Sequence, residues 1–280
     1  MEEEKLWRQI KMHMYAMFKR RGTIISYFAM YVLVLFNFFC NVKEYYGWNI
    51  PCMYSPMKLL FLSGNHSISF YFMQYFPIFV VIPAGFAFIN DKISREIIYI
   101  QARTGKKEYY IGKSIAVFLV TFLVFAVPML FEVLLNVISF PTNAIGDQSN
   151  LNIFDPVYME SVQRYLFHDV WIFNKYIYAV LMIVVFGVAS GLLGVFAGLF
   201  SSVFSFRFKI FVFIPAYTLL YLLAVSEKIL HLDFSTNYFE YLIFFSGSVI
   251  KDNVFILFLM GLLTVDLLLL LVKVRKDVID

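Results

Sequence analysis

Six long apolar stretches alternate with polar segments along the chain. A helix needs roughly 20 apolar residues to cross a bilayer, and each stretch is about that long. The pattern therefore predicts an all-α, polytopic membrane protein with six transmembrane helices. The predicted spans are Thr23–Cys40, Ile68–Ile89, Ser114–Phe140, Asn174–Phe200, Phe208–Val225 and Val254–Val272.

Composition supports a membrane location, and charge orients the chain. Hydrophobic residues make up 61% of the sequence and charged residues 15%, which is too few to cover a soluble domain of this size. The segments on one side of the predicted spans hold 17 Lys and Arg, and those on the other side hold 6. Because cytoplasmic loops carry the excess of Lys and Arg, we expect a multi-pass protein of the cell membrane with both termini in the cytoplasm.

Two shorter segments are apolar without being long enough to cross. Residues 4–21 are expected to form an amphipathic helix on the inner leaflet. Residues 238–250 lie on the outer side before the last span and fit a re-entrant element or a loop that skims the membrane. The residues expected on the apolar face of the first segment are Leu6, Trp7, Ile10, Met14, Met17 and Phe18.

The loop of residues 91–113 and the first residue after it end in Gly112-Lys113-Ser114, and the nucleotide-binding P-loop motif also ends in Gly-Lys-Ser or Gly-Lys-Thr. That motif needs a glycine five residues before Gly112, where this chain has Lys107, so we expect no ATP site here. An apolar stripe at helical spacing instead predicts a short amphipathic helix across the cytoplasmic ends of two spans, ended by Gly105. A solvated, positively charged loop is the alternative. The stripe consists of Ile93, Ile97, Ile100 and Thr104.

The order of these elements resembles the membrane subunit of type-2 ATP-binding-cassette (ABC) exporters. The closest motif match is REIIYIQARTGKKEYYIGK, residues 95–113. In that family an acidic residue after the second span is followed by a short helix, a basic or polar turn and a Gly-Lys pair before the third span. Glu96 and the pair at 112–113 match these places. The family's common Gly-Thr pair and its Pro or Ser before the turn are replaced here by residues 97–98 and 103–105.

The resemblance implies an ATP-driven exporter of an amphipathic substrate (a peptide, an antibiotic or a lipid), with a bacterial system for antimicrobial peptides as the favoured context. Two separate P-loop ATPase subunits would carry ATP and Mg, and a second permease subunit, identical or similar, would complete the assembly. This chain would bind no cofactor, metal or nucleic acid and would hold no catalytic residue. The candidate contacts with the ATPase are Arg95, Glu96, Arg103 and Lys106.

The same resemblance divides the chain into three parts. Residues 1–22 would be the connecting helix on the cytoplasmic side, residues 23–272 the six-helix permease domain, and residues 273–280 a cytoplasmic tail. The coupling loop at 91–113 belongs to the permease domain, and so do the outer loops at 41–67, 141–173 and 226–253.

Two acidic residues fall within predicted spans, where charge is costly and usually faces protein or water. Glu132, with Asn136 one turn along the same face, is a candidate for the substrate path. An interhelical hydrogen bond or a wet position near the surface is an equally weighted alternative. Asp266 is expected to pair with Lys273, two turns away on one face.

Two other function classes stay open. A stand-alone channel or sensor would need no ATPase, and a lipid-modifying membrane enzyme would need clustered His, Asp or Glu, which the sequence does not present. The four histidines fall in four different segments and give no metal-ligand spacing. Cys40 and Cys52 are expected to be unpaired thiols, with a disulfide between them as the alternative.

Overall fold

The computed structural model describes residues 2–50, 53, 55–63, 66–142, 165–204, 206, 208–246 and 248–279, and these residues form helices and no strands. Short 3₁₀ turns occur at η2 (Pro56–Leu59), η3 (Phe61–Ser63) and η4 (Lys209–Val212). The α-helices are α1 (Glu2–Phe18), α2 (Arg21–Glu44), α3 (Ser67–Phe79), α4 (Ala87–Ile93), α5 (Glu96–Thr104), α6 (Lys106–Ser139), α9 (His168–Phe173), α10 (Lys175–Val203), α11 (Phe213–Ile229), α12 (Tyr238–Leu242) and α13 (Asp252–Ile279).

Five helical segments in the described part of the chain are long and apolar enough to cross a membrane. They confirm the all-helical class and the membrane assignment, and they coincide with five of the six predicted spans. The remaining predicted span, the second one at 68–89, stays a prediction. The segments are α2, α6, α10, the run Lys209–Ile229 through η4 and α11, and Asp252–Arg275 in α13.

The predicted second span, 68–89, is not one continuous helix. Helix α3 ends at Phe79, residues 80–86 form turns, and α4 begins at Ala87. Pro83 lies in the turns, where its missing N–H and its ring oppose a continuous helix. The Pro83 carbonyl instead accepts a hydrogen bond of 2.5 Å from the buried Thr23 hydroxyl of α2. A contact with a distant helix therefore stabilises the break.

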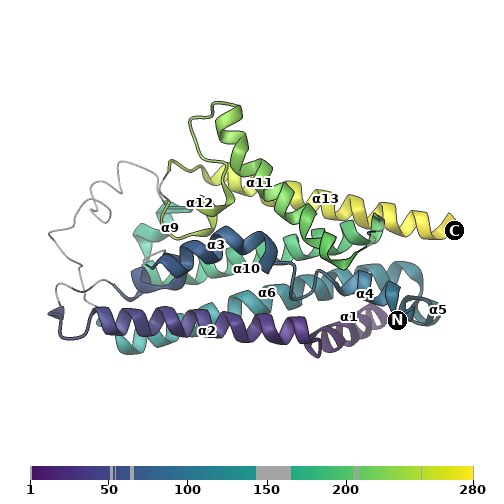
Figure 1. Ribbon diagram of the computed structural model, residues 1–280, viewed down its shortest axis with the longest axis horizontal. Helices are drawn as coiled ribbons and strands as arrows, with labels where there is room; N and C mark the ends of the chain where they lie inside the picture. The colour runs from purple at the N-terminus through teal and green to yellow at the C-terminus, as the bar shows by residue number, and fades with distance from the viewer. Residues whose placement is uncertain are drawn as a thin grey trace.

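Helix α10 packs against α6 through a line of glycines. A Cβ atom on Gly187, Gly191 or Gly194 would come within 2.6–2.8 Å of a side chain of α6, so only glycine permits this approach. Helix α10 also packs on α13, and α2 packs on the other side of α6 (Figure 1). These glycines of α10, which lie within the fourth predicted span, thus serve packing within one chain.

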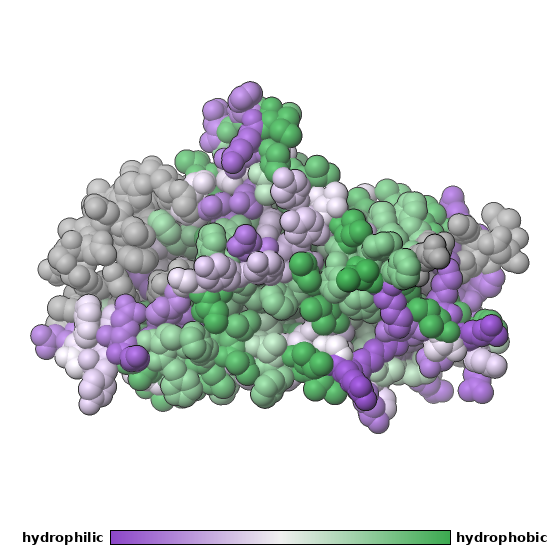
Figure 2. Space-filling model, in the orientation of Figure 1, coloured by the Kyte–Doolittle hydropathy of each residue, from purple (hydrophilic) through white to green (hydrophobic). Residues whose placement is uncertain are grey.

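Both termini lie at the same end of the elongated molecule, here called the terminal end (Figure 1). Helices α1, α4 and α5 gather there, whereas α9 and α12 lie toward the opposite end. In the view of Figure 2, hydrophobic side chains cover much of the lower middle of the molecule, and hydrophilic ones gather toward its two ends and on the projection at the top. This distribution is typical of a helical bundle that crosses a bilayer along its long axis.

Helix α6 is longer than a membrane span. Its 34 residues extend roughly 50 Å, against about 30 Å for the hydrocarbon core of a bilayer. The helix begins at Lys106, before the predicted start of the span at Ser114. Helix α1 packs along the first turns of α6, where a Cβ on Gly112 would lie 3.1 Å from Cβ of Gln9.

The predicted apolar face of α1 is divided between two environments. Ile10 and Met17 are buried and Leu6 and Met14 are half-buried, whereas Trp7 and Phe18 are exposed.

The exposed side of α1 carries two aromatic–lysine pairs. The Lys11 ammonium lies 5.2 Å from the Trp7 ring centroid, and the Lys19 ammonium lies 4.2 Å from that of Tyr15. Amphipathic pairs of this kind are typical of a membrane–water interface.

The segment 238–250 contains the short helix α12 and then irregular backbone. Tyr241, Leu242 and Phe244 are buried in the main core. The N–H of Phe244 donates to the Leu62 carbonyl over 3.0 Å, and the hydroxyl of Tyr178 donates to the Phe244 carbonyl over 2.9 Å. Protein thus shields part of this backbone, and the choice between a re-entrant element and a loop that skims the membrane stays a prediction.

Candidate functional site

Helix α5 and the residues on either side of it form the surface that the sequence predicted as a contact site. Arg95, Glu96, Arg103 and Lys106 are all exposed at the terminal end. The chain forms a short helix here that ends at Thr104, directly before Gly105, whose φ of 93° favours glycine. The N–H of Gly105 donates to the Gln101 carbonyl over 3.0 Å and closes the last turn.

The predicted apolar stripe does not lie on one helix, because Ile93 belongs to α4 and the chain breaks at residues 94–95 before α5 begins. The stripe is also only partly buried. Ile97 and Ile100 pack against the core at the terminal end, while Ile93 is 59% exposed. Two apolar side chains outside the predicted stripe, Ile98 and Tyr99, are 63% and 72% exposed. Next to the exposed charges they form a mixed apolar and charged face that is typical of a protein contact surface. The sequence offered a signal in the unbroken apolar run from Ile97 to Ile100.

A buried polar cluster, here called the Asp91 cluster, lies beside α5 and joins four helices. It consists of Asp91 of α4, Arg20 before α2, Tyr109 and Lys113 of α6, and His13 of α1. Arg20 Nη2 donates to Asp91 Oδ1 over 2.8 Å, and the Tyr109 hydroxyl donates to Oδ2 over 2.9 Å. Lys113 Nζ also donates to Oδ2. These bonds fix α6 and the start of α2 to the carboxylate of α4.

The charges of the Asp91 cluster explain why so polar a group is stable when buried. Burial alone would raise the pKa of Asp91, but the Lys113 charge and the hydrogen bonds from Lys113, Tyr109 and Arg20 together hold that pKa below its usual range. Sequence reasoning missed this cluster. The available signal was an acid directly after the second apolar stretch and a base directly before the third.

His13 completes the Asp91 cluster from α1. Its ring meets the Tyr109 ring edge-on at a centroid distance of 5.4 Å, and its Nε2 has no hydrogen-bond partner among the described residues. Burial, reinforced by the charge of Lys113, lowers the pKa of His13 to about 4. The imidazole is therefore neutral at pH 7 and becomes charged only in acid.

Acid is expected to loosen α1 through His13. The pKa of His13 is lower in the folded than in the unfolded chain. The contribution of the neutral imidazole to stability is therefore fully present above pH 6.5 and is lost as the pH falls from 6.5 to 4. The total loss is on the order of 3 kcal/mol. Thermal unfolding of the detergent-solubilised protein across this range measures the effect. A His13→Phe variant should show a flatter profile, and an unchanged slope would contradict the assignment.

Glu132 and Asn136 lie in a second buried polar cluster, toward the opposite end. Glu132 Oε1 accepts from Asn37 Nδ2 over 2.7 Å, and Oε2 accepts from the Phe61 N–H over 2.9 Å. Asn136 Nδ2 donates to the Pro56 carbonyl over 3.2 Å. The geometry matches the interhelical alternative, because these side chains fasten α2 and the 55–63 segment to α6. The proposed role of Glu132 in a substrate path stays a prediction.

The predicted pairing of Asp266 with Lys273 is not formed. Both carboxylate oxygens of Asp266 are buried without a hydrogen-bond partner among the described residues, and Lys273 Nζ lies 5.8 Å from the Tyr110 ring centroid instead. Two turns of helix separate the two side chains along α13, and the neighbouring α6 offers Lys273 an aromatic ring.

The two cysteines were expected to be unpaired thiols. Cys40 is half-buried and unpaired, and Cys52 lies outside the described residues.

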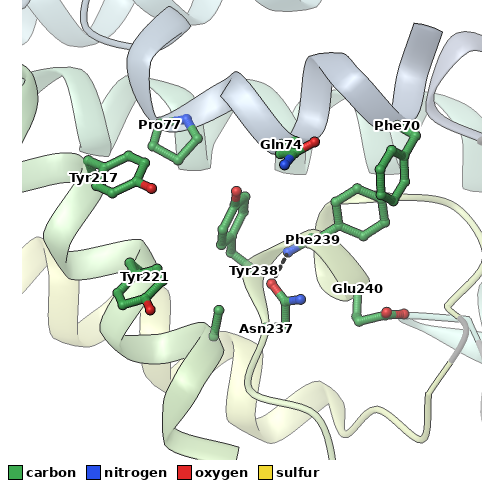
Figure 3. Close-up of a pocket in the computed structure, with 10 residues that line it drawn as sticks. Phe70, Gln74, Pro77, Tyr217, Tyr221, Asn237, Tyr238, Phe239 and Glu240 are labelled. Carbon is green, nitrogen blue, oxygen red and sulfur yellow. Dashed lines mark hydrogen bonds between the residues drawn. The ribbon is translucent and has the colours of Figure 1, made fainter. Parts of the chain in front are cut away.

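A cavity of about 410 Å³ opens between α3, α11 and α12. Figure 3 shows Tyr217 and Tyr221 of α11 on one side and Phe70, Gln74 and Pro77 of α3 on another. Tyr238 projects between them, and its hydroxyl donates to the Met73 carbonyl over 3.0 Å. Glu240 also lines the cavity, but its carboxylate points away from Tyr238 and accepts a hydrogen bond of 2.7 Å from the Ser246 hydroxyl (Figure 3). Such a lining suits an amphipathic molecule, because aromatic faces and a few polar groups converge.

Comparisons with protein-family models, curated proteins and solved structures give no match. The resemblance to ABC exporter subunits accordingly stays a prediction. Among the described residues, no group of three or more His, Cys, Asp or Glu is arranged to hold a metal ion.

Proposed function

We propose that this chain is the membrane permease subunit of an ATP-driven exporter, with its terminal end in the cytoplasm. The observation that carries the proposal is α5, a helix of 9 residues between the interrupted second apolar segment and α6. One side of α5 is anchored through Ile97 and Ile100. Its other side presents Glu96, Ile98 and Tyr99 to the surroundings.

The proposed contact surface is connected to the membrane helices in a way that would transmit a displacement of α5 to them. Helix α5 is separated from α6 by Gly105 alone and from α4 by two residues. The Asp91 cluster then ties α4 to α6 and to the start of α2. A displacement of α5 by an ATPase would therefore move several helices together as a rigid body.

The proposed substrate cavity is the aromatic one between α3, α11 and α12. Its volume of about 410 Å³ is in the range of ligand sites, and its walls come from separate helices that can move apart. The tyrosine faces and hydroxyls favour an amphipathic substrate with a cationic or hydrogen-bonding group. A peptide, an antibiotic or a lipid satisfies this description.

A Glu96→Ala/Arg103→Ala double variant is expected to lose the ATPase partner. Both side chains are exposed on α5, so the permease itself should fold normally. The measurement is the amount of ATPase that co-purifies per permease from the native membrane, and we expect a fall of at least tenfold, or about 1.4 kcal/mol.

The matched control for this double variant is Lys228→Ala/Asp233→Ala. It also removes one base and one acid from exposed positions, but outside α5. Equal ATPase recovery from both double variants would count against α5 as the contact surface. A wild-type chain that transports or conducts without any ATPase would support a channel or sensor instead.

A further inference from the structure

A second cavity, of about 390 Å³, lies at the terminal end between the start of α2, the turns before α4 and the start of α11. It is separate from the aromatic cavity and from the exposed face of α5. Its walls are mainly apolar, and two basic side chains, Arg20 and Lys209, also line it. The apolar lining residues include Ile82, Pro83, Phe86, Ile210 and Phe213.

The two basic side chains donate hydrogen bonds to adjacent residues of α4. Lys209 Nζ donates to Asn90 Oδ1 over 2.9 Å, and Arg20 Nη2 donates to Asp91 Oδ1 over 2.8 Å. Asn90 is neutral, so the charge of Lys209 is not balanced there. Asp91 also binds the buried Lys113 ammonium, so one carboxylate faces two cations. The cavity therefore carries excess positive charge.

The apolar surface continues beyond the charged part of the cavity. Phe86 and Phe213 meet edge-on at a centroid distance of 5.2 Å and form part of the wall. Ile210, which also lines the cavity, is 66% exposed. An occupant thus meets cationic groups and an apolar wall in the same cavity. A soluble anion would use only the cationic part.

We propose that this cavity binds an anionic phospholipid of the surrounding membrane. Its phosphate would lie near Arg20 and Lys209, and an acyl chain would follow the apolar wall. Lipid binding by basic residues at the membrane surface follows from charge attraction, at about 1 kcal/mol per basic group. The proposal does not depend on the transport function, since neither the ATPase contact surface nor the aromatic cavity takes part.

Native mass spectrometry of the full chain in detergent, with phosphatidylglycerol and phosphatidylcholine at equal concentration, tests this site. The wild type is expected to retain phosphatidylglycerol preferentially. A Lys209→Glu variant should bind it at least fivefold more weakly, since about 1 kcal/mol corresponds to roughly fivefold. Lys209 is exposed, so the change should leave the fold intact.

The matched control is Lys92→Glu, which reverses an exposed charge on α4 but does not line the cavity. We expect it to weaken phosphatidylglycerol binding less than twofold. Equal binding by the wild type and the Lys209→Glu variant would overturn the proposal, and so would an equal loss in both variants. Displacement of the lipid by millimolar inorganic phosphate would assign the cavity to a free anion.

Discussion

An Asp91→Ala variant is expected to lose about 3–5 kcal/mol of stability, the cost of breaking a buried ion pair by removing one partner. Lys113 is 1% exposed and would be left as a buried charge without its carboxylate. Such a loss is a large part of the net stability of most folded proteins. The thermal midpoint and the recovery of monodisperse protein in mild detergent measure it.

A double variant separates the charge effect from the loss of packing. Replacing both partners, as Asp91→Ala/Lys113→Met, removes the unpaired charge and should restore part of the lost stability. Asp233→Ala is the control, because Asp233 is exposed and has no described partner. An Asp91→Ala protein that unfolds at the wild-type temperature would refute the assigned role of the Asp91 cluster.

The second large effect is expected at Glu132. A Glu132→Ala variant leaves the Phe61 N–H without its acceptor and removes one of the two acceptors of Asn37 Nδ2. An unsatisfied buried donor costs about 1–3 kcal/mol, so we expect a loss of about 3 kcal/mol. Glu132→Gln keeps one side-chain oxygen as an acceptor and should lose less. Thermal unfolding in detergent again provides the measurement.

The matched control for Glu132 is Glu44→Ala, since Glu44 is an exposed carboxylate at the end of α2. We expect it to cost less than about 0.5 kcal/mol, as surface substitutions usually do. A Glu132→Ala protein that keeps its stability but loses substrate export would reverse the interpretation and place Glu132 in the substrate path.

The sequence was most informative where local rules decide the structure. Apolar runs of span length gave the five long helices, because length and hydropathy suffice for that inference. The end of α5 was predictable from Gly105, since a positive φ after a helical stripe favours glycine. The glycines of α10 were also interpretable, because small residues at helical spacing permit close packing.

The remaining features depend on contacts between distant segments. The break after α3 involves Pro83, and its position is stabilised by Thr23 from another helix. The Asp91 cluster joins residues from four segments, which no spacing rule links. For Asp266 the spacing rule predicted a contact that does not form. Lys273 lies two turns away on the same helical face, yet the two side chains do not pair. The predicted contact surface was identified by charge, and its apolar members, Ile98 and Tyr99, were assigned to it from their exposure, although they belong to an apolar run in the sequence.

The most direct test of the central claim is affinity purification of the wild-type chain from its native membrane under gentle extraction, followed by a measurement of ATP turnover. We expect a separate P-loop ATPase to co-purify, with turnover that depends on the added nucleotide and Mg. Recovery of the intact chain without any ATPase would contradict the exporter proposal, and a stand-alone channel or sensor would take its place.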